Sequence, residues 1–424
     1  MTLIVSMKQA GFPVWLWVLA LGVFWANANA GFQAGIAVRG VTPDPLLPVS
    51  GGLGPSHAVH KKEGELTVRA LVFKDDTTAV AIVSSDFLGF PSALGNRVRS
   101  RIKGIPGTNI LIGATHTHSA PDCYAFPDGK GGTSADLGYL DRVCNEMVAA
   151  IEEALRLVRP AKLRAATGEA RGKIAYNYYA EQLYDPRCHL LQAVGEDGKP
   201  IATLVNYAIH PEVIGADAGI LSPDLVGPLY DRIQAQGGGV GIFMNGAQGG
   251  MVTADNRAEG GGEHRNWAEC VRIGRLLADE SMRILSGAPL QTEPRLFCTS
   301  RTIHFPVDSP LLRGIMKASP LGFQGTEDGR ISTQLNLVNV GNAQIVTIPG
   351  EALPNIGYYL KRNMRGEHRF LFGLTNDAFG YILTKEDFGS FKRYEYVTRT
   401  SLGERTADIL EEAVLRLVKE SPSP

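Results

Sequence analysis

Histidines stand at the ends of two apolar segments of this 424-residue chain. His116 and His118 directly follow the apolar run 109–114, and His210 follows the apolar run 201–209. If extended backbone continues past residue 114, His116 and His118 point to the same side, because alternate residues of a strand share a face. Imidazole nitrogen is a common protein ligand of zinc. The pattern therefore indicates a metal site, although each histidine taken alone also fits a structural role.

A carboxylate follows a third apolar segment. The run Ile348-Pro349-Gly350-Glu351 places Glu351 after a predicted strand and at the start of a predicted helix. The helix dipole alone favours an acid there. As an oxygen ligand, Glu351 would complete a set of two histidines and one glutamate, which holds catalytic zinc and leaves a position open for water. Zinc in such a site lowers the pKa of its water and polarises a carbonyl group, so the set predicts a hydrolase.

The elements that must position these residues alternate between short β-branched runs and longer helical stretches. The predicted strands are 68–73, 79–84, 109–114, 201–209 and 240–244, and the predicted helices are 140–158, 223–236, 267–285, 352–362 and 403–419. Ser222-Pro223 is predicted to cap and open one helix. Gly341-Asn342 predicts a hairpin between 335–340 and 344–348. We therefore expect the α/β class, with a layered domain in which helices flank a mixed β-sheet.

Residues 1–30 have the pattern of a signal peptide. Lys8 precedes an apolar run from Val14 to Trp25, and Ala28-Asn29-Ala30 offers small residues at a cleavage position. The apolar run is shorter than the ~20 residues that a membrane-spanning helix needs. We expect export, to a periplasm or out of the cell, and a single catalytic domain over residues 31–424. An uncleaved anchor or a buried helix is the alternative for the first 30 residues.

Composition excludes some classes of partner and chemistry. The formal net charge is -1, so no basic field indicates nucleic acid. The five cysteines are irregularly spaced, and one or two disulfides or scattered core thiols fit them equally well. The sequence contains no Gly-x-Ser-x-Gly motif, which argues against a serine α/β-hydrolase. The run from Asn245 to Gly250 lacks nucleotide-binding spacing, and we expect its backbone N–H groups to approach a ligand.

Taken in their order, these motifs resemble the neutral/alkaline, non-lysosomal ceramidase family. The most specific match is Ala114-Thr115-His116-Thr117-His118-Ser119, and the segment 376–395 also matches. The resemblance implies a zinc amidase that cleaves the amide of an N-acyl sphingoid base. The zinc ligands that the resemblance implies are His116, His210, Glu351 and Tyr394 (within Arg393-Tyr394-Glu395). The residues that it implies to assist the reaction are His118 and Tyr381.

The sequence departs from the family where substrate is handled. Thr253 stands at the position of a family serine, Met251 replaces a family acid, and Asn177-Tyr178-Tyr179 lacks a family arginine. We therefore expect a zinc-dependent hydrolase that cleaves an amide bond of an N-acyl substrate by a zinc-activated water. The substrate would be a small-molecule or lipid amide, including one presented at a membrane surface. The alternatives are a zinc hydrolase of a different amide or an ester, and a non-catalytic exported binding protein.

Overall fold

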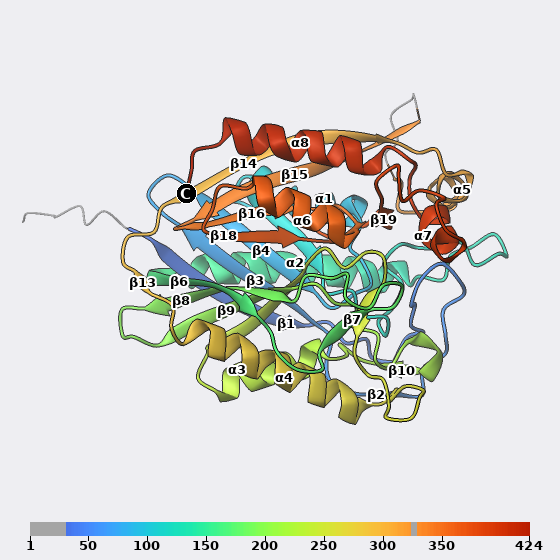
Figure 1. Ribbon diagram of the computed structural model, residues 1–424, viewed down its shortest axis with the longest axis horizontal. Coiled ribbons are helices and arrows are strands. Elements are labelled where there is room, and N and C mark those ends of the chain that lie inside the picture. The colour runs from blue at the N-terminus through green and yellow to red at the C-terminus, as the bar shows by residue number, and fades with distance from the viewer. Residues whose placement is uncertain (1–30, 324–328) are drawn as a thin grey trace, which may run out of the picture.

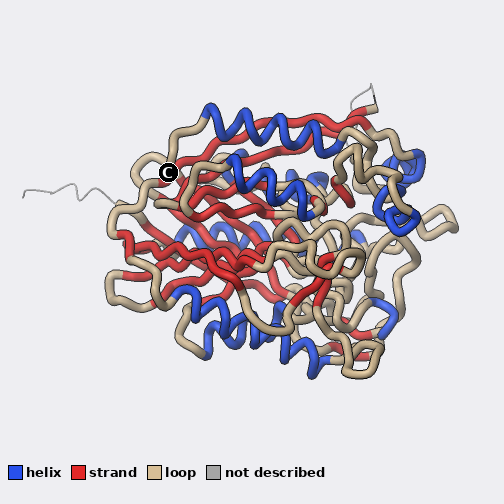
Figure 2. Tube along the Cα trace, viewed as in Figure 1, coloured by secondary structure: helices blue, strands red, loops and turns tan. Residues whose placement is uncertain are grey.

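The computed structural model describes residues 31–323 and 329–424, so the predicted signal peptide lies outside the described residues. Two β-sheets pack face to face, and helices cover the outer face of each sheet (Figures 1 and 2). The predicted fold class, an α/β domain with a mixed sheet flanked by helices, is confirmed. The pairing of two sheets was not part of that prediction.

The larger sheet has nine strands within the described residues, in the order β11-β9-β8-β6-β1-β3-β4-β5 with β13 paired to β6. It is mixed, because β4 and β5 are parallel, as are β9 and β11, while the other pairs are antiparallel. Its strands are β1 (Gln33–Gly40), β3 (Thr67–Lys74), β4 (Ala79–Ser85), β5 (Ile110–Ala114), β6 (Arg159–Glu169), β8 (Arg187–Gly195), β9 (Pro200–Tyr207), β11 (Val240–Asn245) and β13 (Leu290–Gln291).

The smaller sheet contains the predicted hairpin. Over residues 31–323 and 329–424 it has four strands, in the spatial order β14 (Leu296–Pro306), β15 (Arg330–Val340), β16 (Ala343–Thr347) and β18 (His368–Phe372). Val340 pairs with Ala343 across the turn at Gly341-Asn342, which confirms that prediction. Apolar side chains such as Phe73 and Ile82 from the larger sheet meet Phe370 and others from the smaller sheet in a buried layer between the two.

Amphipathic helices close the outer faces. The helices α1 (Ser92–Arg99) and α2 (Leu137–Arg156) cover one half of the larger sheet, and α3 (Val226–Ala235) and α4 (Trp267–Leu285) cover the other half. The smaller sheet is covered by α6 (Pro354–Asn363) and α8 (Thr406–Glu420), while α5 (Pro310–Ala318) and α7 (Glu395–Arg399) are short. No helix in the described ranges is long and apolar enough to cross a membrane.

Side-chain caps set where the longer helices begin. The Asp136 carboxylate accepts the N–H of Tyr139 at the start of α2, and Asn266 caps α4 in the same way. The predicted start of α3 at Ser222-Pro223 is wrong, since that helix begins at Val226. Asp224 has a left-handed φ of 55°, which interrupts the helical path. The disulfide alternative is also not realised, because all five cysteines are free thiols.

In the described part of the chain, three pairs of very short strands lie beyond the ends of the main strands. These pairs are β2 (Lys61–Lys62) with β10 (Ile220–Leu221), β7 (Ala175–Asn177) with β12 (Val252–Ala254), and β17 (Glu351–Ala352) with β19 (Tyr381–Ile382). In the last pair, Glu351 lies in register with Tyr381. These short pairings bring together residues that are distant in the chain.

Candidate metal centre

His116 and His118 leave the end of β5 through a tight turn. The N–H of Thr115 donates to the Ser85 carbonyl and that of His116 to the Phe87 carbonyl, both at 2.9 Å. His116 has a φ of 76°, so the extended geometry expected for this segment ends there. The two imidazoles nevertheless come together, with ring centroids 4.8 Å apart and planes nearly perpendicular. The turn at His116, rather than strand alternation, makes the pair converge.

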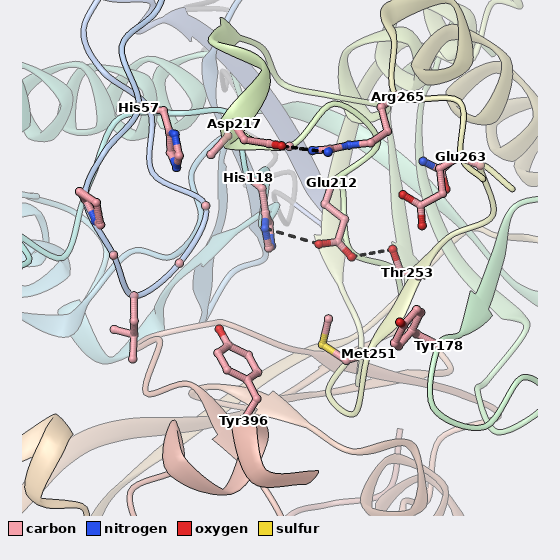
Figure 3. Close-up of a pocket in the computed structure, with 18 of the residues that line it drawn as sticks. His57, His118, Tyr178, Glu212, Asp217, Met251, Thr253, Glu263, Arg265 and Tyr396 are labelled. Atoms are coloured by element: carbon pink, nitrogen blue, oxygen red, sulfur yellow. Dashed lines mark hydrogen bonds and ion pairs between the residues drawn. The ribbon is translucent and has the colours of Figure 1, made fainter. Parts of the chain in front are cut away.

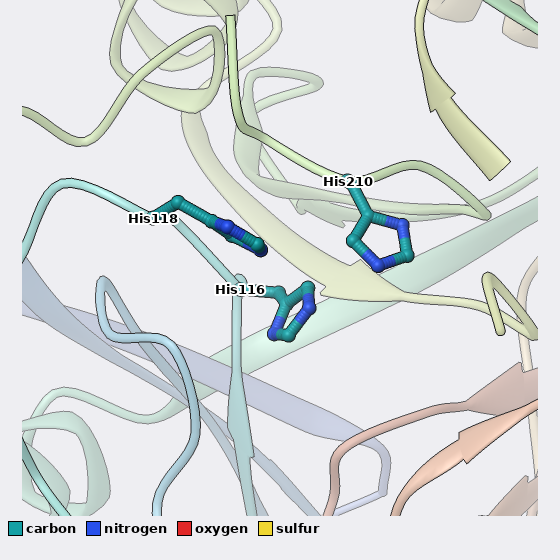
Figure 4. A group of neighbouring side chains, drawn as sticks. All are labelled: His116, His118 and His210. Atoms are coloured by element: carbon teal, nitrogen blue, oxygen red, sulfur yellow. The ribbon is translucent and has the colours of Figure 1, made fainter. Parts of the chain in front are cut away.

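His210 completes a compact group of imidazoles. The candidate ligand atoms of His116, His118 and His210 all lie within 4.8 Å of one another, and the three rings face a shared space (Figure 4). Nδ1 of His116 lies 2.5 Å from the Leu88 carbonyl oxygen, and Nδ1 of His210 lies 2.8 Å from that of Val252. A carbonyl only accepts, so each Nδ1 is the protonated nitrogen. Nε2 of each ring is therefore the nitrogen that faces the group and would bind a metal after losing its proton, an arrangement typical of metal-bound histidine.

The Glu351 carboxylate faces these two Nε2 atoms. Its Oε2 lies 3.5 Å from Nε2 of His116 and 3.2 Å from Nε2 of His210. Burial alone would raise the pKa of Glu351, but the adjacent imidazoles of His116 and His210 outweigh burial and hold that pKa below its ordinary value. Glu351 is therefore an anion at neutral pH. The backbone fixes its place, because its N–H donates to the Gly380 carbonyl at 2.8 Å.

His118 is held differently. Its Nδ1 lies 3.5 Å from the carboxylate of Glu212, whose other oxygen accepts a 2.6 Å hydrogen bond from the Thr253 hydroxyl. Burial lowers the pKa of His118 to about 3, although Glu212 acts in the opposite direction, so the ring is neutral. Its Nε2 is buried and has no hydrogen-bond partner among the described residues. An unpartnered imidazole nitrogen beside the Nε2 atoms of two further histidines and an ionised carboxylate fits a divalent transition metal such as zinc.

The two tyrosines predicted from the family resemblance lie in different environments. Tyr381 is buried beside Glu351, and its hydroxyl donates to the sulfur of Met251 at 3.1 Å. Burial, reinforced by the negative charge of Glu351, raises the pKa of Tyr381 well above its ordinary value. A metal at the group would act in the opposite sense, since a nearby cation favours phenolate.

Tyr394 is not brought to the group. Its ring packs on Tyr179 and Phe391, with centroids 5.5 and 5.4 Å away. Tyr394 precedes α7, and residues two positions apart on a helix point in nearly opposite directions. Tyr396 therefore turns inward instead, with its ring 5.9 Å from that of Tyr381. The geometry thus places the phenol of Tyr381, and not that of Tyr394, beside the proposed ligands.

Two cavities meet at the histidines. The larger, named here the polar cavity, has a volume of about 500 Å³ and is lined by His57, Tyr178, Glu212, Thr253, Glu263 and Arg265 among others (Figure 3). The smaller, named the apolar cavity, has a volume of about 90 Å³ and is lined by Leu88, Phe126, Leu312, Ile315, Met316 and Phe379 together with His116 and Glu351. His118 and Tyr396 line both. The histidine group therefore lies where the two cavities meet.

Sequence reasoning missed Glu212, Tyr396 and the role of the glycine-rich run. Glu212 lies two positions after His210 in the sequence, and this closeness to a proposed ligand could have indicated that it belongs to the site. The N–H of Gly246 donates to the Tyr207 carbonyl and that of Gly249 to the Ala352 carbonyl. The run therefore packs against the backbone that carries the histidine and the glutamate, and these two N–H groups do not face a ligand as expected.

Comparison with known proteins identifies the class of fold. No protein-family model matches the chain. The structure superposes on the neutral ceramidase of Pseudomonas aeruginosa with a TM-score of 0.76 and 16% identity, covering 93% of this chain and 76% of that one. A ceramidase complexed with C2 matches with a TM-score of 0.73 and 17% identity, over the same shares of the two chains. The chain therefore has the fold of neutral ceramidases.

A sequence relative gives the same family. Neutral ceramidase B of Dictyostelium discoideum is 26% identical over 213 residues, which cover 44% of this chain and 29% of that protein. The resemblance to the neutral ceramidase family that the motifs indicate is confirmed. The matched part spans less than a third of the Dictyostelium relative, so activity and substrate are matters for proposal.

Proposed function

We propose that this protein is a zinc-dependent hydrolase that cleaves an amide bond of an N-acyl substrate. The observation that carries the proposal is the convergence of two anchored imidazoles, His116 and His210, with the ionised carboxylate of Glu351 at the junction of two cavities. The ceramidase relatives support amide chemistry. A zinc ion held by these side chains would supply a water of lowered pKa and polarise the substrate carbonyl.

The remaining site residues have complementary roles in this proposal. Tyr381 lies against Glu351 and is the fourth candidate ligand, in place of Tyr394. His118 is the candidate for proton transfer, because Glu212 holds its Nδ1 and the neutral ring leaves Nε2 free to take up a proton and then pass it to the leaving nitrogen. The alternative is that His118 is a third nitrogen ligand, which the same convergence of ring nitrogens allows.

Metal analysis and an amidase assay test the proposal. Purified wild type is expected to bind one zinc ion per chain, and His116→Ala and Glu351→Ala to lose both the metal and activity. His304→Ala is the matched control, since His304 lies on β14 and hydrogen-bonds to Ser332 outside the site. Absence of stoichiometric zinc in the wild type, or unchanged activity in both site variants, would refute the proposal. Metal-dependent turnover of any substrate would exclude the alternative of a non-catalytic binding protein.

We also propose that the protein is exported after removal of residues 1–30. The support is the basic, apolar and small-residue pattern of that segment. Fractionation of cells producing the full chain, with sequencing of the N-terminus of the exported protein, tests this. Export should yield Gly31 as the first residue, whereas retention with Met1 intact would contradict the proposal.

A further inference from the structure

A further pocket, named here the cationic pocket, is lined only by basic and phenolic side chains. Its lining residues are Arg187, Tyr358, Tyr359, Lys361, Arg362 and Arg369. None of these residues lines either cavity at the histidines, and no aspartate or glutamate of the described residues lines the cationic pocket. Arg187 opens β8, Arg369 lies on β18 and the other four lie on α6. Like charges held close together repel, so the arrangement favours a bound anion.

One carboxylate, that of Asp185, adjoins the cationic pocket. Its Oδ1 accepts a hydrogen bond from Nε of Arg187 at 2.7 Å, and its Oδ2 accepts from Nη2 of Arg187 at 2.8 Å and from Nζ of Lys361 at 2.9 Å. Burial alone would raise the pKa of Asp185, but Lys361 and Arg187 outweigh burial and lower that pKa. A single buried anion is therefore shared by two basic side chains.

The other two arginines have no carboxylate partner among the residues that the structure describes. Nε of Arg369 donates to the Gly366 carbonyl and its Nη1 to the Lys361 carbonyl, both at 2.9 Å. Arg362 is exposed and forms neither a hydrogen bond nor an ion pair within the described ranges. Arginine keeps its charge throughout the accessible pH range. Three arginines beside one carboxylate therefore make the cationic pocket positive, whether or not Lys361 carries a proton.

The dipole of α6 accounts for only part of this arrangement. Lys361 and Arg362 lie in the last turn of α6, where a positive charge is favoured. Arg187 and Arg369 come from two strands, and the helix dipole gives no reason for four basic side chains to line one pocket.

Two nearby glutamates do not neutralise the pocket. Glu169 pairs with Arg187 in the register of the larger sheet, but the two side chains form no ion pair in the described part of the chain. The carboxylate of Glu367 accepts a 2.7 Å hydrogen bond from Asn342, and its other oxygen lies 3.9 Å from Nε2 of His368. Both glutamates are therefore outside the cationic pocket.

Several donors of the pocket are uncommitted. Nη1 of Arg187, Nη2 of Arg369 and the hydroxyl of Tyr359 form no hydrogen bond with any described residue, and the guanidinium of Arg362 is free. The contacts at their other nitrogens hold Arg187 and Arg369 in place. Guanidinium groups pair best with oxyanions that accept several N–H bonds. Donors that line one pocket from a helix and two strands suit a tetrahedral group better than a planar carboxylate, because its oxygens point in more directions.

We propose that the cationic pocket binds a tetrahedral oxyanion, a phosphate or sulfate group, either in a soluble compound or in a lipid headgroup. Arg187 and Arg369 hold the oxyanion from the two strands, and Arg362 closes on it from α6. This proposal is independent of the proposed hydrolase function, since the pocket shares no lining residue with the cavities at the metal centre.

Calorimetric titration of the purified protein in a low-salt buffer free of phosphate tests the proposal. The probes are inorganic phosphate, sulfate and acetate. We expect phosphate and sulfate to bind at least about 10-fold more tightly than acetate. Added sodium chloride should weaken their binding, because charges in a surface pocket are screened by salt. His116→Ala, which lacks a proposed metal ligand, should bind phosphate within about twofold of wild type if the anion is not held at the metal centre.

Variants of Arg362 test the pocket itself. Arg362→Gln should weaken phosphate binding about 10-fold, and Arg362→Glu should abolish measurable binding. Because Arg362 has no partner in the described ranges, both variants should unfold at the wild-type temperature. Arg275→Gln is the matched control, since it removes the same charge from an exposed position on α4 that does not line the pocket.

Cosedimentation with vesicles of phosphatidylcholine, with and without phosphatidic acid, identifies the source of the oxyanion. Retention on phosphatidic acid vesicles that is lost in Arg362→Glu assigns a lipid headgroup. Binding of free phosphate or sulfate without such retention assigns a soluble compound.

Three results would overturn the proposal. One is the absence of binding to the free anions and to the vesicles alike. The second is an effect of Arg275→Gln as large as that of Arg362→Gln, which would show a response to overall charge. The third is loss of phosphate binding in His116→Ala, which would place the anion at the metal centre.

Discussion

Gly249 offers a test of how the backbone positions Glu351 without altering any proposed ligand. A Cβ added at Gly249 would lie 2.7 Å from the carbonyl carbon of Glu351 and 2.8 Å from that of Ala352. Carbon atoms in contact are normally ~3.5 Å or more apart, so in Gly249→Ala the Glu351 backbone must recede by about 0.8 Å, and by more to clear the still closer Glu351 carbonyl oxygen. A misplacement of ~1 Å at a catalytic site can lower the rate about 100-fold. We therefore expect Gly249→Ala to lower kcat/KM by about 10- to 100-fold.

Zinc affinity, measured by competition with a chromogenic chelator, should fall in the same variant. The assay is paired with kcat/KM on the best amide substrate found in the amidase assay and with thermal unfolding, which reports whether the variant is folded. Gly287→Ala is the control, since a Cβ at Gly287, just after α4, meets open space. If folded Gly249→Ala keeps zinc affinity and kcat/KM within about twofold of wild type, the backbone contact does not position Glu351 and the reasoning fails.

Four further predictions concern single groups and the metal. Tyr381→Phe should lower kcat/KM about 100-fold, whereas Tyr394→Phe should stay within about twofold, and equal effects would contradict the placement of the two phenols. Thr253→Val should lower kcat about 10- to 100-fold, because it removes the hydroxyl that donates to Glu212, whereas Thr253→Ser should retain most activity. Equal activity of the two variants would show that this hydrogen bond to Glu212 does not matter for the reaction. Burial raises the pKa of Asp86 to about 6, so its contribution to stability is present at low pH and is lost as the pH rises through about 6. Relative to Asp86→Asn, the wild-type free energy of unfolding should therefore fall by about 3 kcal/mol between about pH 4 and pH 7, and denaturant titrations showing a constant difference would contradict this. Zinc at ~1,000 times its Kd should raise the free energy of unfolding by about 4 kcal/mol, and an unfolding midpoint unaffected by zinc would argue against a folded-state site.

The parts of the fold that sequence predicts well are those with strong local signals. The helix expected over 267–285 is α4 with the same bounds, because a cap, an apolar stripe and a basic last turn coincide there. The strands β4, β5 and β11 also match within a residue or two, since each is a short apolar run that ends in polar residues. His116, His210 and Glu351 were identifiable for the same reason, as polar residues directly following apolar runs.

The parts that sequence reasoning missed depend on pairing between distant segments. Strand β8 is buried along nearly its whole length, so it lacks the alternation that marks a half-exposed strand. Glu351 and Tyr381 meet through a pair of two-residue strands, which leave no periodic pattern. Tyr394 and Tyr396 differ by two positions in a short helix, and only the helix orientation decides which ring turns inward.

The candidate metal ligands and the residues that line the polar cavity lie on different parts of the structure. His116 lies just beyond β5, and the backbone hydrogen bonds of the adjoining strands hold the candidate ligands in place. The polar cavity is instead lined largely by loop residues such as Glu263 and Arg265, which can change without disturbing the ligands. The residues that would contact substrate can therefore vary independently of the candidate ligands, and activity has to be tested at the site itself. Because Glu212 lines the polar cavity and also contacts His118, a charged group bound in that cavity would lie close to the residue proposed for proton transfer. A change in the charge of the part of the substrate that binds there should therefore alter kcat as well as KM.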